Sequence, residues 1–212
     1  MKFRDSAPIS ELVARLGRNL GSLSGPGVAE VMARFTRHAA GRVDAVTPST
    51  NAVIEAHLST AIAAMPDRDL ASAIQAAAPW LPWTTFDRYN ELIGEAFASS
   101  HALVRLIGEG APITANDFEV GLFLLQPRVF YRDHEHAAPE LYVPLTGPHG
   151  WRFAPGDPLV PKPAGETIWN PPFRPHAIKV GDVPFLSYYV WTSDVKEPSC
   201  VIPAADWEEM EC

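Results

Sequence analysis

Residues 131–147 read YRDHEHAAPELYVPLTG, and the rest of the chain can be interpreted around this segment. His134, His136, Glu140 and Tyr142 all occupy even positions. In an extended chain, residues two or four positions apart project from the same face. Two strands joined by a short turn would therefore bring two imidazoles, a carboxylate and a phenol into one small volume.

This residue set predicts a metal site. Neutral imidazole together with carboxylate suits borderline divalent ions such as zinc, iron(II), manganese, cobalt or nickel. The best-placed further ligand is the histidine that closes the segment PPFRPH, residues 171–176. We therefore expect one divalent transition metal, with zinc, iron(II) and manganese as candidates, bound by His134, His136, Glu140 and His176. The other interpretation is a surface hairpin whose polar side chains are simply solvated.

A helical zinc-protease motif does not fit the same segment. That motif places its two histidines four positions apart on one helix face, whereas His134 and His136 are only two positions apart. Pro139 would also interrupt a helix here. The metal motif is therefore expected on strands.

The first half of the chain is expected to be helical. Apolar residues recur at helical spacing, with capping residues before them and glycine or proline after them. Alanine-rich helices with narrow apolar stripes need a surface to pack on, so we expect them to lie against the following sheet. His38, His57 and His101 are isolated and are interpreted as surface or cap residues. The expected helices cover 10–21, 28–40, 52–65, 69–78 and 86–97, and the last pattern can extend to 107.

The composition changes near Pro112, where prolines and short runs of β-branched and aromatic residues begin. Such runs, bounded by turn formers, predict strands. Many short strands at close spacing indicate a sandwich or barrel. We expect an α+β protein with a helical N-terminal extension over 1–110 and a β-barrel over 111–212. The expected strands cover 118–125, 129–136, 140–145, 150–153, 166–169, 176–180 and 185–192.

Composition excludes several classes of function. The formal net charge of -8 would repel phosphate backbones, so nucleic acid is not an expected partner. We find no apolar window long enough to span a bilayer and no apolar signal core at the amino terminus, so a cytoplasmic protein is expected. Cys200 and Cys212 are too few for a disulfide framework and are expected to be reduced thiols.

The spacing H-x-H-x3-E-x6-G, from His134 to Gly147, resembles the first motif of the cupin superfamily. Gly165-x5-Pro171, followed five residues later by His176, resembles the second motif. The resemblance implies a single-cupin jelly-roll barrel. The chain departs from the usual pattern at three positions that affect turn geometry and not the ligands, namely Arg128, Phe173 and Val180.

Within the cupins, this segment together with PPFRPHAI and SYYVW downstream resembles the dimethylsulfoniopropionate (DMSP) lyases. The resemblance implies a carbon–sulfur lyase that cleaves a small sulfonium carboxylate into dimethyl sulfide and acrylate. It implies His134, His136, Glu140 and His176 as metal ligands, Tyr142 as catalytic base and Tyr131 as an assistant at the substrate. It also implies pocket aromatics at Trp191 and at Tyr188 or Tyr189.

Two other functions stay open at the level of sequence. A cupin with the same ligands could be a metal-dependent dioxygenase or isomerase of another small carboxylate, because the fold does not determine the reaction. A non-catalytic cupin could also use the metal only to shape a binding pocket. We allow for a homodimer in each case.

Overall fold

The computed structural model describes residues 6–86 and 91–211 of the protein. Most of its helices lie in the first half of the chain, as expected, and two of them begin at capping side chains. Asn51 accepts a hydrogen bond from the Ile54 amide, and Asp67 accepts one from the Leu70 amide. The helices are α1 (Ala7–Gly21), α2 (Val28–Ala39), α3 (Ala52–Ala64), α4 (Arg68–Ala77), α5 (Glu95–Ala98) and α6 (Trp207–Glu211), with 3₁₀ turns η1 (Ala78–Trp80) and η2 (Glu91–Ile93).

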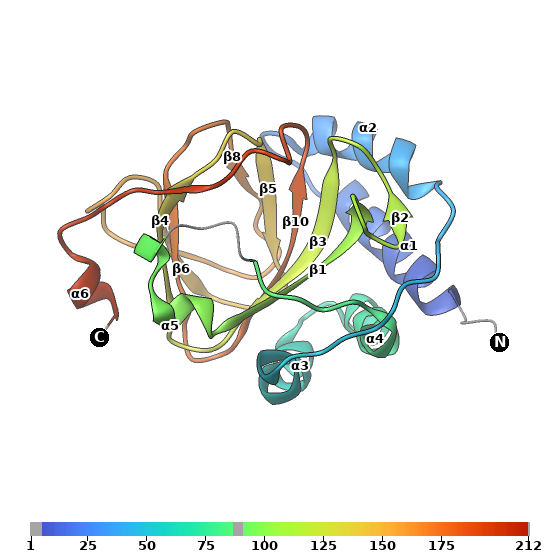
Figure 1. Cartoon of the computed structure of the whole chain (residues 1–212), viewed down its shortest axis with the longest axis horizontal. Coiled ribbons are helices and arrows are strands. Elements are labelled where there is room, and N and C mark those ends of the chain that lie inside the picture. Colours follow the sequence, from blue (N-terminus) through green and yellow to red (C-terminus); the bar gives the residue numbers. More distant parts are fainter. Residues whose placement is uncertain (1–5, 87–90, 212) are drawn as a thin grey trace.

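The strands form two sheets, one of six strands and one of five. The larger sheet has the order β2-β1-β3-β10-β5-β8 and the smaller has the order β11-β4-β9-β6-β7. Figure 1 shows α1 and α2 toward the right of the molecule, α3 and α4 below β1 and β3, and α6 at the far left end. The strands are β1 (His101–Gly108), β2 (Ile113–Thr114), β3 (Glu119–Leu125), β4 (Phe130–Glu135), β5 (Glu140–Pro144), β6 (His149–Arg152), β7 (Val160–Lys162), β8 (Ile168–Asn170), β9 (His176–Lys179), β10 (Phe185–Trp191) and β11 (Cys200–Val201).

The larger sheet separates two hydrophobic cores. On its outer face, helix residues such as Leu16 and Ile74 pack with Val104, Leu122 and Tyr188 in one cluster. A second cluster, which contains Trp151 and Phe185, fills the space between the two sheets. The helical half therefore packs against the larger sheet, and the expected α+β fold, with helices first and a β-structure of two facing sheets after them, is confirmed.

The expected continuation of a helix to residue 107 is wrong. Residues 101–108 form β1, which pairs with β3 inside the larger sheet and is buried along nearly its whole length. A strand buried on both faces is a continuous apolar run, which periodicity alone cannot separate from a buried helix. The sheet therefore begins before the expected boundary at 110/111, and the division into two domains stays a prediction. Residues 87–90 of the expected helix lie outside the described residues.

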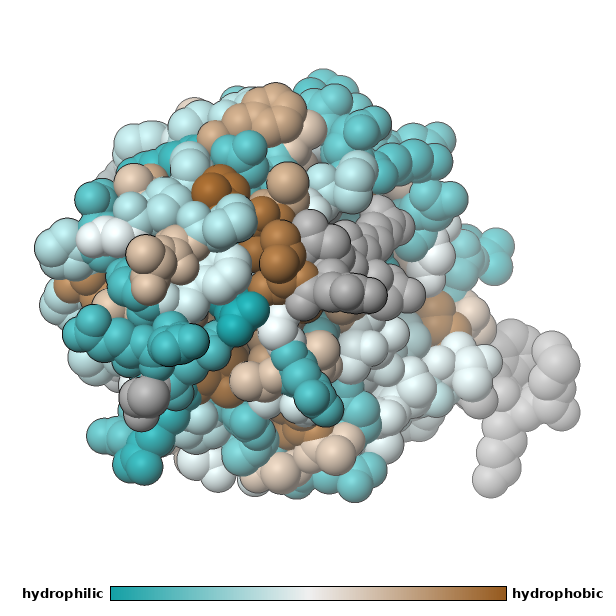
Figure 2. Space-filling model, turned by 60° about the vertical axis from the view of Figure 1, so that its left-hand side comes forward, coloured by the Kyte–Doolittle hydropathy of each residue, from teal (hydrophilic) through white to brown (hydrophobic). Residues whose placement is uncertain are grey.

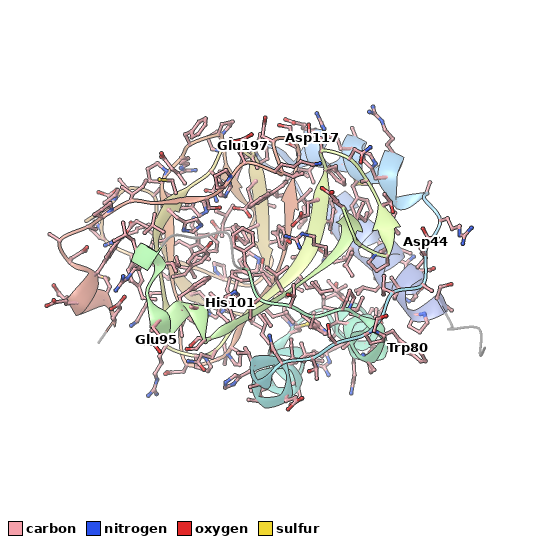
Figure 3. All side chains as sticks on the ribbon, in the orientation of Figure 1. Asp44, Trp80, Glu95, His101, Asp117 and Glu197 are labelled. Atoms are coloured by element: carbon pink, nitrogen blue, oxygen red, sulfur yellow. The ribbon has the colours of Figure 1, made fainter. Side chains whose placement is uncertain are left out.

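His101 is also placed differently from the expectation of a surface or cap residue. It is 1% exposed at the start of β1, and Figure 3 shows it close to α5, the short helix that carries Glu95. Its Nδ1 lies 2.9 Å from the Phe97 carbonyl oxygen, and its Nε2 accepts the Phe86 amide at 2.7 Å. Burial lowers the pKa of this imidazole. A neutral His101 therefore ties the segment that precedes β1 to the sheet.

The surface is mainly polar. Figure 2 shows one face on which hydrophilic residues surround a small group of hydrophobic ones. Four large hydrophobic side chains are exposed in the described part of the chain, and they come from separate elements: Trp80, Leu92, Val160 and Phe173. None of the helices in 6–86 and 91–211 combines the length and apolar character needed to cross a membrane. Cys200 is a free, exposed cysteine, and Cys212 lies outside the described residues.

Candidate metal centre and adjoining pocket

Three histidines meet between the two sheets. His134 on β4 pairs directly with His176 on β9, and His136 follows the end of β4. The register of β4 shifts between Tyr131 and His134. One ring nitrogen from each histidine lies within 4.8 Å of the others, and all three side chains are buried. The structure therefore brings together the three histidines expected from the sequence.

Backbone carbonyls orient the three imidazoles. Nδ1 of His134 lies 2.8 Å from the Arg132 carbonyl, Nδ1 of His136 lies 2.8 Å from the Ala138 carbonyl, and Nδ1 of His176 lies 3.0 Å from the carbonyl of residue 174. A carbonyl oxygen only accepts hydrogen bonds, so each Nδ1 must carry the proton and donate it. In the neutral rings the lone pair is then on Nε2. This arrangement is typical of metal-binding histidines.

Glu140 completes the cluster. Its Oε2 lies 3.1 Å from Nε2 of His136 and 3.4 Å from Nε2 of His176, and its Oε1 accepts a hydrogen bond from Trp191 Nε1 at 2.6 Å. Burial raises the pKa of Glu140. The adjacent His136 and His176 together lower it by more than burial raises it, so the net shift of the pKa is downward. Glu140 is therefore a buried carboxylate that faces imidazole lone pairs.

The imidazole lone pairs and the negative charge of Glu140 converge on a position where a cation would bind favourably. Burial holds the pKa of His134 well below its usual range, as does the positive charge that His176 and His136 carry when protonated. Nε2 of His176 is buried, and no hydrogen bond within the described residues satisfies it. A divalent metal would use all three nitrogens and the carboxylate at once. The residues present therefore fit the metal that the sequence predicted.

A pocket adjoins this cluster, and one side of it is formed by two rows of residues across the strands β3, β10 and β5. In one row Glu119, Trp191 and Glu140 lie side by side, and in the next Gly121, Tyr189 and Tyr142 do so. The cavity measures about 30 Å³, room for roughly two water molecules, so a larger ligand requires the lining side chains to move. The lining residues are Phe86, Leu103, Glu119, Phe123, Tyr131, His134, His136, Glu140, Tyr142, Tyr189 and Trp191.

Both tyrosines expected at the reaction lie in this pocket. Tyr142 is 4% exposed, and its ring centroid is 6.3 Å from that of His176. Tyr131 is stacked between two rings, with centroid distances of 4.0 Å to His134 and 4.2 Å to Phe97. The rings of Tyr142 and Tyr131 therefore both lie beside the histidine cluster.

Tyr189 and Tyr188 lie on opposite faces of β10. Tyr189 lines the pocket and donates its hydroxyl proton to Glu119 Oε1 at 2.6 Å. Tyr188 faces the helical layer, where its hydroxyl donates to the Asn19 side chain at 2.9 Å. Neighbouring residues of a strand alternate between faces, so of these two tyrosines Tyr189 lines the pocket and Tyr188 does not.

Four pocket residues were not expected from the sequence: Phe86, Leu103, Glu119 and Phe123. Three of them are apolar and resemble any other core position. Glu119 carried a signal, because it is a charged residue at the start of the otherwise apolar run EVGLFLL, residues 119–125. Buried glutamates are rare unless they are paired, but the sequence does not say which strand supplies the partner.

Gly121 makes room for Tyr189. A Cβ at this position would lie 2.5 Å from the Val104 carbonyl oxygen and 2.6 Å from Tyr189 Cε1. The added methyl group would press on the backbone of β1 and on the Tyr189 ring at once, and the backbone cannot move away easily. Gly121→Ala should therefore displace the Tyr189 ring and lower the free energy of unfolding by about 1–3 kcal/mol. Urea denaturation measures this change. Gly21→Ala is the matched control, since its Cβ meets only Met32 at 3.7 Å, and equal midpoints for both variants would contradict the prediction.

Comparison with known proteins identifies the family. The family model of the dimethylsulfoniopropionate lyases matches residues 27–187, most of the chain. The chain belongs to this family. The curated DMSP lyase DddQ of Ruegeria pomeroyi is 28% identical over 138 residues, which span 65% of this chain and 65% of that protein. The alignment thus covers less than two thirds of the relative's length.

Solved structures agree with this assignment at the level of the fold. The crystal structure of the DMSP lyase DddQ from Ruegeria pomeroyi DSS-3 superposes with a TM-score of 0.71 at 20% identity, covering 95% of this chain and 98% of that one. A chain from the crystal structures of the DMSP lyases RdDddP and RnDddQII gives the same TM-score and identity, covering 93% and 98%. Both superpositions include the helical half, so the helices before the barrel are part of the shared fold.

Proposed function

We propose that the protein is a metal-dependent carbon–sulfur lyase that cleaves DMSP to dimethyl sulfide and acrylate. The main observation that supports this proposal is that the histidine cluster adjoins a pocket lined by Tyr142 and Tyr131. We take DMSP as the substrate because the family model of the DMSP lyases matches most of the chain. The reaction is an elimination without redox change.

His134, His136, Glu140 and His176 are the proposed metal ligands. A bound divalent ion, with zinc, iron(II) and manganese as candidates, would supply positive charge that binds the substrate carboxylate and stabilises negative charge beside it. The backbone carbonyls that accept from each Nδ1 hold the rings in this orientation. Trp191 Nε1 donates a hydrogen bond to Glu140 and thereby orients its carboxylate.

Tyr142 is the proposed base. It follows Glu140 by two positions on β5, so both side chains point into the barrel from the same face of the strand. Its phenolate oxygen would accept the α-proton of the substrate, the α–β carbon bond would become double, and the carbon–sulfur electron pair would leave with dimethyl sulfide. Tyr131, fixed between His134 and Phe97, would orient the substrate.

Aromatic rings supply a surface for the sulfonium end of the substrate. Trp191 and Tyr189 lie side by side on the pocket wall, with ring centroids 6.2 Å apart. The face of an aromatic ring attracts a cation by about 0.5–2 kcal/mol. The departing dimethyl sulfide is neutral and loses this attraction, which favours its release.

A headspace assay tests the proposal. Purified full-length protein loaded with one equivalent of zinc, iron(II) or manganese should release dimethyl sulfide from DMSP, with acrylate formed in equal amount. Oxygen consumption should stay at background, because elimination uses none. Absence of dimethyl sulfide with all three metals would contradict the lyase assignment, and oxygen uptake would support a dioxygenase in its place. The cytoplasmic location and the homodimer stay predictions.

A further inference from the structure

Glu119 is a buried carboxylate in the pocket with no role in the reaction proposed above. It is 4% exposed and lies at the start of β3. Its Oε1 accepts the hydroxyl of Tyr189 at 2.6 Å, and its Oε2 accepts Nε of Arg105 at 2.8 Å. Burial of an ionised carboxylate is costly even when it is paired. A chain that only needed a stable barrel could place an apolar residue here.

The position of Glu119 relative to the metal cluster suits a substrate with charges at both ends. Glu119 and Glu140 occupy the same row of the sheet, with Trp191 on the strand between them. Two strand spacings separate their backbones by roughly 10 Å. In a 3-sulfoniopropionate, single bonds of ordinary length put the sulfur roughly 4 Å from the carboxyl carbon. With the carboxylate at the histidine cluster, the sulfonium would extend over Trp191 toward Glu119.

The ion pair with Arg105 does not cancel this charge inside the pocket. The Arg105 side chain is 23% exposed, against 6% for Glu119, and Arg105 is not among the residues that line the cavity. Water therefore screens the guanidinium more strongly than the carboxylate. The other carboxylate oxygen is hydrogen-bonded to Tyr189, and both residues line the cavity. A cation in the cavity would therefore experience a net negative field at this end.

We propose that Glu119 is a specificity-determining residue that selects ligands with a positive charge three bonds from a carboxylate. This inference rests on the proposed function, because it takes the carboxylate end of the ligand to lie at the histidine cluster. Trp191 and Tyr189 hold the sulfonium by their ring faces, and Glu119 rejects the neutral thioether or alkyl analogue. Discrimination then arises from charge as well as from the shape of the pocket.

Binding of two stable ligands to the metal-loaded full chain tests the inference. One is 4-methylpentanoate, the neutral carbon isostere of DMSP, and the other is 3-(trimethylammonio)propionate, which has a cation in place of the sulfonium. Calorimetric titration should show at least about tenfold tighter binding of the cationic ligand by the wild type. Glu119→Gln should bring the two dissociation constants to within about threefold, mainly by weakening the cationic ligand. Equal binding of both ligands by the wild type would overturn the inference.

Two further variants control for charge and for folding. Asp182→Asn removes one carboxylate from an exposed pair with Arg128 and should leave the wild-type ratio unchanged. A double variant, Arg105→Gln with Glu119→Gln, removes both members of the ion pair and leaves no unpaired guanidinium. This double variant should also lose the preference for the cationic ligand. It replaces Glu119→Gln in the test if that single variant does not fold. A preference that survives in the folded variants would assign selection to the aromatic rings alone and overturn the role of Glu119.

The outcome is separable from that of the lyase assay. Release of dimethyl sulfide by wild-type protein, together with a ligand preference that does not depend on Glu119, would overturn this inference and leave the lyase in place. A Glu119-dependent preference without dimethyl sulfide release would overturn the lyase and leave the selection of cationic carboxylates in place.

Discussion

His176→Ala should lose its tightly bound metal and, with it, more than about 100-fold of the rate of dimethyl sulfide release. Loss of groups that only support a metal ligand already costs about 10–100-fold, and His176 is itself one of the three converging nitrogens. Its side chain is fully buried between the sheets, so the substitution leaves a cavity in place of the nitrogen ligand. Elemental analysis after dialysis gives the metal content, and the headspace assay gives the rate.

His149→Asn is the matched control for removal of a buried histidine. His149 lies on β6 near the same barrel interior, but its ring nitrogens contact Thr146 and the Gly181 amide and not the metal cluster. This variant should keep one equivalent of metal even if its stability falls. One equivalent of tightly held metal in His176→Ala would remove His176 from the ligand set.

The histidine cluster could be predicted from the sequence because three of the four expected ligands are close in the chain. These are His134, His136 and Glu140, and alternation along β4 and β5 turns His134 and Glu140 inward. The two strands belong to different sheets, so these side chains meet across the space between the sheets. His176 was found through the spacing of a second motif. The structure adds what spacing does not contain, namely the three backbone carbonyls that orient the imidazoles.

Features that depend on strand pairing could not be predicted in the same way. Leu103 and Glu119 enter the pocket because β3 lies next to β10 in the sheet and β1 lies next to β3. Adjacent tyrosines at 188 and 189 gave no indication of which one faces inward, since a shift of one residue exchanges the two faces. β1 itself was taken for helix because both of its faces are covered. Most of the features that could not be predicted therefore depend on which strands, far apart in the chain, pair with one another.

Tyr142→Phe should keep the fold and the metal while losing about 10²–10⁴-fold in the rate of dimethyl sulfide release, the usual range for loss of a general base. Phenylalanine preserves the ring contacts with Trp151, Phe185 and Tyr189 and removes only the hydroxyl. Free tyrosine has a pKa of about 10, so a phenolate base predicts a wild-type rate that rises toward alkaline pH. Steady-state rates between neutral and alkaline pH, with metal content measured on the same samples, test both expectations.

Tyr131→Phe is the matched control, because it removes another buried pocket phenol whose ring is held by stacking on Phe97 and His134. If Tyr131 mainly orients the substrate, its variant should lose less rate than Tyr142→Phe. Proton NMR of unreacted DMSP recovered from deuterium oxide gives a second readout: where proton abstraction is reversible, deuterium should enter the α-position with wild type and not with Tyr142→Phe. Near-wild-type release of dimethyl sulfide by Tyr142→Phe would exclude this residue as the base and transfer the role to Tyr131, the other phenol beside the histidine cluster.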